Sequence, residues 1–168
     1  MNPVAEDTLP PPSESRRDAD GRLTRLSFAS PNSAPTAPVW LVAIDGSVHA
    51  QRAVVAALRL ADDMKACSLH LLHVQHWLSK EAAESELLAR GLAVSQQARH
   101  LVAISGHPWQ LHLALGSSAE TIISIARELN CQGIVVGCRG LGTAGHLLLG
   151  SVSSRVIQLS PIPVLAVP

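Results

Sequence analysis

The sequence lacks any uninterrupted apolar run approaching the roughly 20 residues that a membrane-spanning helix requires. It also lacks a charge excess, since 13 Lys and Arg residues balance 13 Asp and Glu residues, so no basic surplus is available for nucleic acid or an anionic membrane. The apolar stretch of a secretory signal is missing too, because Pro10, Pro11 and Pro12 stand in its place. We therefore expect a soluble protein that has neither nucleic acid nor a membrane as a partner.

Cysteine is scarce. Cys67, Cys131 and Cys138 are odd in number and far apart, which fits a reducing compartment better than a disulfide framework. Cytoplasmic localisation is therefore expected. The 168 residues suffice for one well-buried domain and are too few for two ordinary ones.

Residues 1–38 are rich in Pro, Ser, Asp and Arg and poor in apolar side chains. Such a segment buries too little surface to offset its ordering entropy, so we expect a flexible N-terminal tail. An alternative is that Arg22 to Phe28, which contains Leu23 and Leu26, docks as a short arm on the domain or on a partner chain.

Residues 39–168 alternate between strand and helix patterns. Val39 to Ile44, for example, is a continuous apolar run of the kind that forms a strand buried on both faces. Strands are expected at residues 39–44, 68–74, 109–115, 133–136 and 164–167. Helices are expected from about 47 to 64, 81 to 104, 117 to 129 and 147 to 159. Right-handed crossovers then predict an α/β domain with a five-stranded, mainly parallel sheet and helices on both faces.

In such sheets, ligands bind beyond the carboxyl ends of the strands, where the strand order reverses. The loops after the first and fourth predicted strands are therefore candidates. The fourth is followed by Gly137, Gly140, Gly142 and Gly145, whose missing Cβ atoms allow backbone N–H groups to approach a phosphate. Small hydroxyl side chains follow in the segment 150–154. The alternative is that this loop merely connects strand to helix.

Four motifs resemble those of the universal stress protein family, and they occur along the chain in the same order as in that family. Gly137-x2-Gly140-x9-Gly150-Ser151 is similar to the nucleotide motif of its ATP-binding members, and Asp45-Gly46-Ser47 is similar to their opening signature. Leu72-His73-Val74 resembles the end of their second strand, and the segment 163–167 resembles their closing strand. The resemblance covers 39–168 and implies a Rossmann-like fold of the adenine nucleotide alpha hydrolase type.

The resemblance also implies a binding site. Its ligand would be ATP, or ADP or AMP, together with Mg²⁺ held by Asp45; the alternative is that Asp45 caps the following helix. A homodimer through Val164 to Val167 and an unidentified protein partner are implied as well. The residues matching the nucleotide site are Ala43, Ile44, Asp45, Val74, Val136, Gly137, Arg139, Gly140, Gly150, Ser151, Val152 and Ser153.

Catalysis is not expected to be the main activity. The sequence contains no Gly-x4-Gly-Lys-[Ser/Thr] segment, and its lysines, Lys65 and Lys80, lie outside the glycine-rich loop. The first hypothesis is therefore a nucleotide-dependent stress-response module in which binding is the signal. The alternatives are a slow Mg²⁺-dependent ATPase or phosphotransferase, and a stress-response dimer that binds AMP or another nucleotide.

Two further groups of residues are interpreted as structural. His70, His73 and His76 are close in sequence, but on a strand His70 and His73 point to opposite faces, which disfavours a metal site. Cys138 is next to Arg139 and is interpreted as a small loop residue rather than a redox sensor.

Overall fold

The computed structural model describes residues 9–30, 38–65, 67–139 and 149–168, which form seven strands and four helices. The strands are β1 (Glu14–Arg17), β2 (Leu23–Ala29), β3 (Val39–Ala43), β4 (Ser68–Gln75), β5 (Trp109–Leu115), β6 (Gly133–Gly137) and β7 (Val164–Val167). The helices are α1 (Val48–Met64), α2 (Lys80–Ser105), α3 (Ser118–Glu128) and α4 (Ser151–Leu159). Among these helices, none has the length and apolarity to cross a membrane.

All seven strands belong to one sheet, in the order β1-β2-β5-β4-β3-β6-β7. The five strands from β3 to β7 are mutually parallel, whereas β2 is antiparallel to both β1 and β5. The predicted α/β fold with a mainly parallel sheet is therefore confirmed, and the predicted count of five strands is two too low. The helix expected from about 147 begins at Ser151 within the described residues.

The prediction of a flexible tail over residues 1–38 is wrong for β1 and β2. Leu23, Leu26 and Phe28 point into the core from β2 and are 2–6% exposed. The composition of the whole segment concealed this short stretch of apolar residues, which needs only an existing sheet edge to bury them. The docked-arm alternative describes these residues correctly, with β5 as the edge that receives β2.

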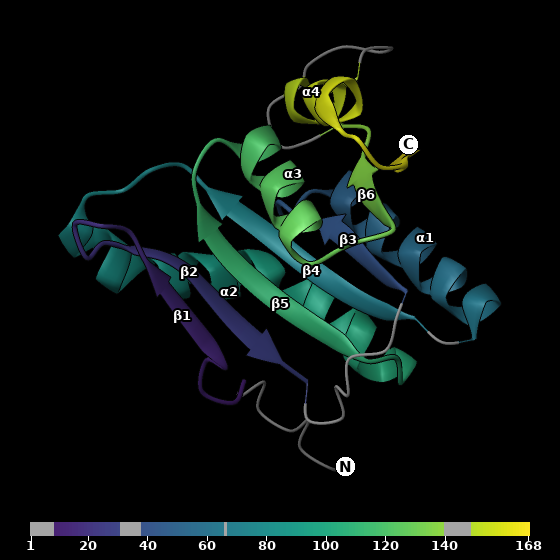
Figure 1. Ribbon diagram of the computed structural model, residues 1–168. Coiled ribbons are helices and arrows are strands. Elements are labelled where there is room, and N and C mark those ends of the chain that lie inside the picture. The colour runs from purple at the N-terminus through teal and green to yellow at the C-terminus, as the bar shows by residue number, and fades with distance from the viewer. Residues whose placement is uncertain (1–8, 31–37, 66, 140–148) are drawn as a thin grey trace.

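The sheet separates two hydrophobic layers. One layer lies between the sheet and helices α1 and α2, and includes Val42, Leu71 and Leu113. The other lies under α3 and α4 and includes Leu41 and Leu72. Figure 1 shows α3 and α4 in front of the sheet and α2 behind it, so the prediction of helices on both faces is confirmed.

The strand order reverses at β3, which has β4 on one side and β6 on the other. The chain leaves β3 through α1 to reach β4, but it reaches β6 through α3 on the opposite face of the sheet. Connections that diverge in this way leave a crevice at the carboxyl ends of the central strands.

Candidate functional site

The loop after β3 is held by its own side chains. The N–H of Ile44 donates to the carbonyl of Leu72 at 2.9 Å, which extends the pairing with β4 by one residue. Gly46 then turns the chain at a φ of +82°, a conformation that favours glycine. The Asp45 carboxylate accepts the N–H of Ser47 at 2.9 Å, and the Ser47 hydroxyl accepts the N–H of Ala50 at 3.1 Å. Ser47 is therefore the N-cap of α1, and Asp45 orients that cap.

The end of β6 approaches α1 so closely that Gly137 has no room for a side chain. A Cβ atom there would lie 2.6 Å from the carbonyl carbon of His49, which is backbone and cannot easily move. Cys138 continues the strand pairing, since its N–H donates to the carbonyl of Val167 at 2.7 Å. The glycine at position 137 is thus required for the packing of β6 against α1, independently of any ligand.

The carbonyl of Cys138 fixes the beginning of α4 beside β6. It accepts the N–H of Gly150 at 2.7 Å and lies 3.0 Å from the Ser153 hydroxyl, which is also 3.0 Å from the carbonyl of Gly150. Ser153 is 3% exposed, and its single hydroxyl proton is committed to these carbonyls. Ser153 therefore positions α4 rather than offering a donor to the solvent side.

The first turn of α4 is not capped by a side chain, because its N-cap residue is Gly150. The first N–H groups of a helix have no acceptor within the helix, and they carry the positive end of its dipole. The exposed hydroxyl of Ser151 has no hydrogen-bond partner among the described residues. This helix end thus presents donors toward the crevice.

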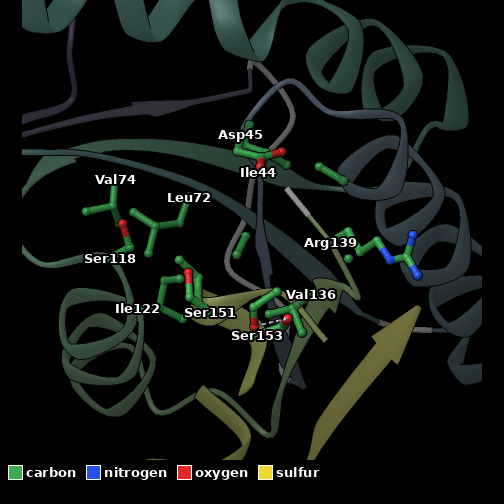
Figure 2. Close-up of a pocket in the computed structure, with 15 residues that line it drawn as sticks. Ile44, Asp45, Leu72, Val74, Ser118, Ile122, Val136, Arg139, Ser151 and Ser153 are labelled. Carbon is green, nitrogen blue, oxygen red and sulfur yellow. Dashed lines mark hydrogen bonds between the residues drawn. The ribbon is translucent and has the colours of Figure 1, made fainter. Parts of the chain in front are cut away.

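These elements surround a pocket of about 280 Å³ at the carboxyl ends of β3, β4 and β6 (Figure 2). Its lining comprises Ala43, Ile44, Asp45, Ala50, Leu72, Val74, Ser118, Ile122, Val136, Gly137, Arg139, Gly150, Ser151, Val152 and Ser153. The eleven predicted site residues that the structure describes all belong to this set, whereas Gly140 lies outside the described residues.

The pocket has two chemically different ends. Leu72, Val74 and Ile122 form an apolar end beside Ser118, and Figure 2 shows Arg139 at the opposite end. The guanidinium of Arg139 points away from the other labelled side chains, so Arg139 lines the pocket with the part of the residue nearest the backbone. The polar end therefore consists mainly of backbone groups and serine hydroxyls.

Four of the described lining residues were not predicted, namely Ala50, Leu72, Ser118 and Ile122. Leu72 was recoverable from strand geometry, because it lies two residues before Val74 and so on the same face. Ser118 and Ile122 belong to α3, the helix after β5, and therefore lie outside the two loops that were predicted to bind a ligand. Ser117 is the N-cap of α3 and makes no side-chain capping hydrogen bond.

Metal ligands are sparse around the pocket. Among the described lining residues, Asp45 is the one carboxylate, and no group of three or more His, Cys, Asp or Glu side chains in the described parts of the chain is arranged to hold a metal ion. His73 hydrogen-bonds the carbonyl of Ile44 at 3.1 Å, and burial lowers its pKa, which that carbonyl and Asp45 partly counteract. His70 instead contacts His112 on the other face of the sheet.

Comparisons with known proteins agree with this architecture. The model of the universal stress protein family matches residues 40–168. The chain is 34% identical over 145 residues to the universal stress protein YxiE of Bacillus subtilis, covering 76% of this chain and 96% of that protein. The universal stress protein from Archaeoglobus fulgidus solved in complex with dAMP has a TM-score of 0.62 at 22% identity, covering 78% of this chain and 97% of that one.

A second solved structure, a universal stress protein in complex with cAMP, has a TM-score of 0.57 at 25% identity and covers 77% of this chain and 94% of that one. The family match runs from β3 to the C-terminus and contains all of the described residues that line the pocket. With the fold, the pocket and these matches in agreement, the chain belongs to the universal stress protein family.

Proposed function

We propose that the pocket binds an adenine nucleotide, ATP in the first instance, and that the protein is a nucleotide-dependent regulatory module of the stress response. The observation that carries this proposal is the division of one pocket into an apolar end and an end rich in backbone donors. A purine fits the first chemically and phosphates fit the second, since helix N-termini attract anions. Relatives of this fold solved with dAMP and with cAMP support the assignment to adenine nucleotides.

The base is assigned to the surface formed by Leu72, Val74 and Ile122, and the phosphates to the first turn of α4. Backbone N–H groups of Ser151 and Val152 and the hydroxyl of Ser151 supply the phosphate donors. Ser153 holds that turn in place through its bonds to backbone carbonyls. The ribose then lies between Ile44, which follows β3, and Gly137, the last residue of β6.

The residues present fit a Mg²⁺ ion that is bound together with phosphates. The Asp45 carboxylate uses one lone pair for the N–H of Ser47 and retains others. Mg²⁺ commonly takes one or two carboxylates together with substrate phosphates and water. When bound, the ion would neutralise phosphate charge, and Asp45 is the residue that would hold it.

We propose that binding of the nucleotide, rather than its turnover, is the signal. We further propose that the protein forms a homodimer through β7 and is located in the cytoplasm. Neither Lys65 nor Lys80 is among the described residues that line the pocket, so a lysine of the Walker type is not available from them. The three cysteines are all unpaired, which supports a reducing compartment.

Isothermal titration of ATP, ADP and AMP, with and without Mg²⁺, tests the proposal. We expect saturable binding by the wild type and its loss in Val74→Trp, whose added ring fills the apolar end. Leu88→Trp, which adds the same ring at an exposed position on α2, is the matched control and keeps binding. Ser151→Glu should weaken ATP more than AMP, because the added charge faces the phosphates.

A folded wild-type protein, freed of co-purified ligand, that binds none of these nucleotides would overturn the proposal. Steady release of ADP beyond one turnover would instead favour the slow ATPase.

A further inference from the structure

Ser118 carries a hydroxyl group that faces the apolar end of the pocket. It is the first residue of α3 and is half-buried. Figure 2 shows its oxygen directed toward Val74. Among the described residues, this hydroxyl has no hydrogen-bond partner, whereas the Ser153 hydroxyl in the same pocket is engaged by two carbonyls. The Ser118 hydroxyl is therefore available to a bound molecule.

The surroundings of Ser118 make such a contact selective. The neighbouring lining side chains at this end, Leu72, Val74 and Ile122, are hydrocarbons, and Leu72 and Ile122 are almost completely buried. A bound base would exclude water here, so a polar atom of the base that reached this end without a partner would be destabilised. Ser118 offers the matching group, because a hydroxyl both accepts and donates a hydrogen bond.

We propose that Ser118 is a specificity residue that accepts a hydrogen bond from the exocyclic amino group of adenine. This inference rests on the proposed nucleotide function. If the ribose and phosphates occupy the end near Gly137 and Arg139, the base enters with its glycosidic nitrogen facing that end. The atoms farthest from that nitrogen are the 6-amino group and the adjoining ring nitrogen, and these face α3 and Ser118 (Figure 2).

The test is a thermodynamic cycle between the side chain and the amino group. Affinities of wild type and Ser118→Ala are measured for ATP and for purine riboside triphosphate, which lacks the 6-amino group. Loss of one neutral hydrogen bond predicts that Ser118→Ala binds ATP about three- to tenfold more weakly. The same substitution should leave affinity for the analogue within about twofold, because the partner atom is missing from it.

Ser117→Ala is the matched control, since Ser117 is exposed, makes no side-chain capping bond and does not line the pocket. It should bind both ligands as the wild type does, and all three proteins should melt at similar temperatures.

Three outcomes would overturn the inference. Equal ATP affinity of wild type and Ser118→Ala would overturn it while leaving the nucleotide function intact, as would equal weakening toward both ligands. Absence of binding to either ligand by the folded wild type would overturn both the inference and the function on which it rests.

Discussion

The two edges of the sheet are built in opposite ways. At one edge, β1 is short and exposed throughout, and its arginines pair with carboxylates: Arg16 with Glu128, and Arg17 with Glu84. At the other edge, β7 is apolar, and within the described residues it pairs only with β6. Figure 1 shows β1 and the C-terminus on opposite sides of the molecule.

The difference indicates which edge is closed and which is available for association. Charged side chains on a short edge strand discourage pairing with another chain. The β7 edge carries Leu165, which is 39% exposed, and α4 adds the exposed side chains of Ile157 and Leu159 nearby. An apolar edge of this kind supports the proposed dimer through β7, whereas the hairpin at β1 and β2 terminates the sheet.

Phe28→Ala tests whether the hairpin is an integral part of the domain. Phe28 is 2% exposed and packs in the layer under α2, so its truncation should destabilise the protein by about 3–5 kcal/mol. Urea unfolding, with hydrogen exchange of β5 amides as a second readout, measures the effect. Ser15→Ala on exposed β1 is the control and should change stability little. A similarly small change in Phe28→Ala would show that β2 adds nothing to the stability of the domain.

Acidification should destabilise the packing of β2, β5 and β4 through two buried histidines, His70 and His112. His112 bridges Ser27 and His70 at 2.9 Å each, and both rings can satisfy these bonds when neutral. Burial lowers the pKa of His70 from 6.5 to about 4; burial, together with charges on His70 and Arg25, lowers that of His112 to about 3.

These shifts set the sign of the pH dependence. Below pH 6.5 the unfolded chain binds protons that the folded chain refuses, so stability falls as the pH drops from about 6.5 toward 4. The His70 shift alone corresponds to roughly 3 kcal/mol. Denaturant unfolding at several pH values should show a shallower decline in a His70→Gln and His112→Gln double variant. His100→Gln, at an exposed position on α2, should decline like the wild type, and an unchanged slope in the double variant would contradict this account.

Leu165→Lys should disrupt the association of two protein chains through the β7 edge of the sheet. A charge placed in a β7 interface would be buried without a partner, so we expect the dimer to dissociate at concentrations at least about tenfold higher than for the wild type. Sedimentation velocity measures the change. Ser15→Lys puts the same charge on the β1 edge and should leave the mass of the sedimenting species the same as that of the wild type. If the wild type is monomeric, or if both variants behave alike, β7 is not the association edge.

The central parallel strands were predictable because they are continuous apolar runs followed by capped helices. Val39 to Ile44 and Gly133 to Val136 required burial on both faces, and only a sheet covered by helices provides that. These features are determined locally, by periodicity and by Ser47 as a cap, so the sequence alone identifies them.

The hairpin and half of the apolar end of the pocket were not predictable in the same way. Arg25 looks like a surface residue in the sequence, yet it is buried because Glu128, 103 residues later, meets it with two hydrogen bonds. Ser118 likewise becomes a pocket residue only because α3 packs beside α4 and over β4. Both depend on tertiary pairing that no local pattern encodes.

Glu128→Gln tests that distant pairing and should have the smallest effect. The Arg25 side chain is 6% exposed and keeps a contact with Glu14 at 3.3 Å, so loss of the Glu128 charge leaves it partly compensated. Glu128 itself is one-third exposed, and solvent screening limits the expected destabilisation to about 1 kcal/mol. The bond to Arg25 holds the pKa of Glu128 below its usual range, so this contribution is present above about pH 4.5 and is lost on acidification. Glu120→Gln, on the same helix as Glu128, breaks an exposed pair with Arg155 of α4 and should change stability less than Glu128→Gln does. Equal effects of the two substitutions would mean that burial of Arg25 adds nothing to its pairing with α3.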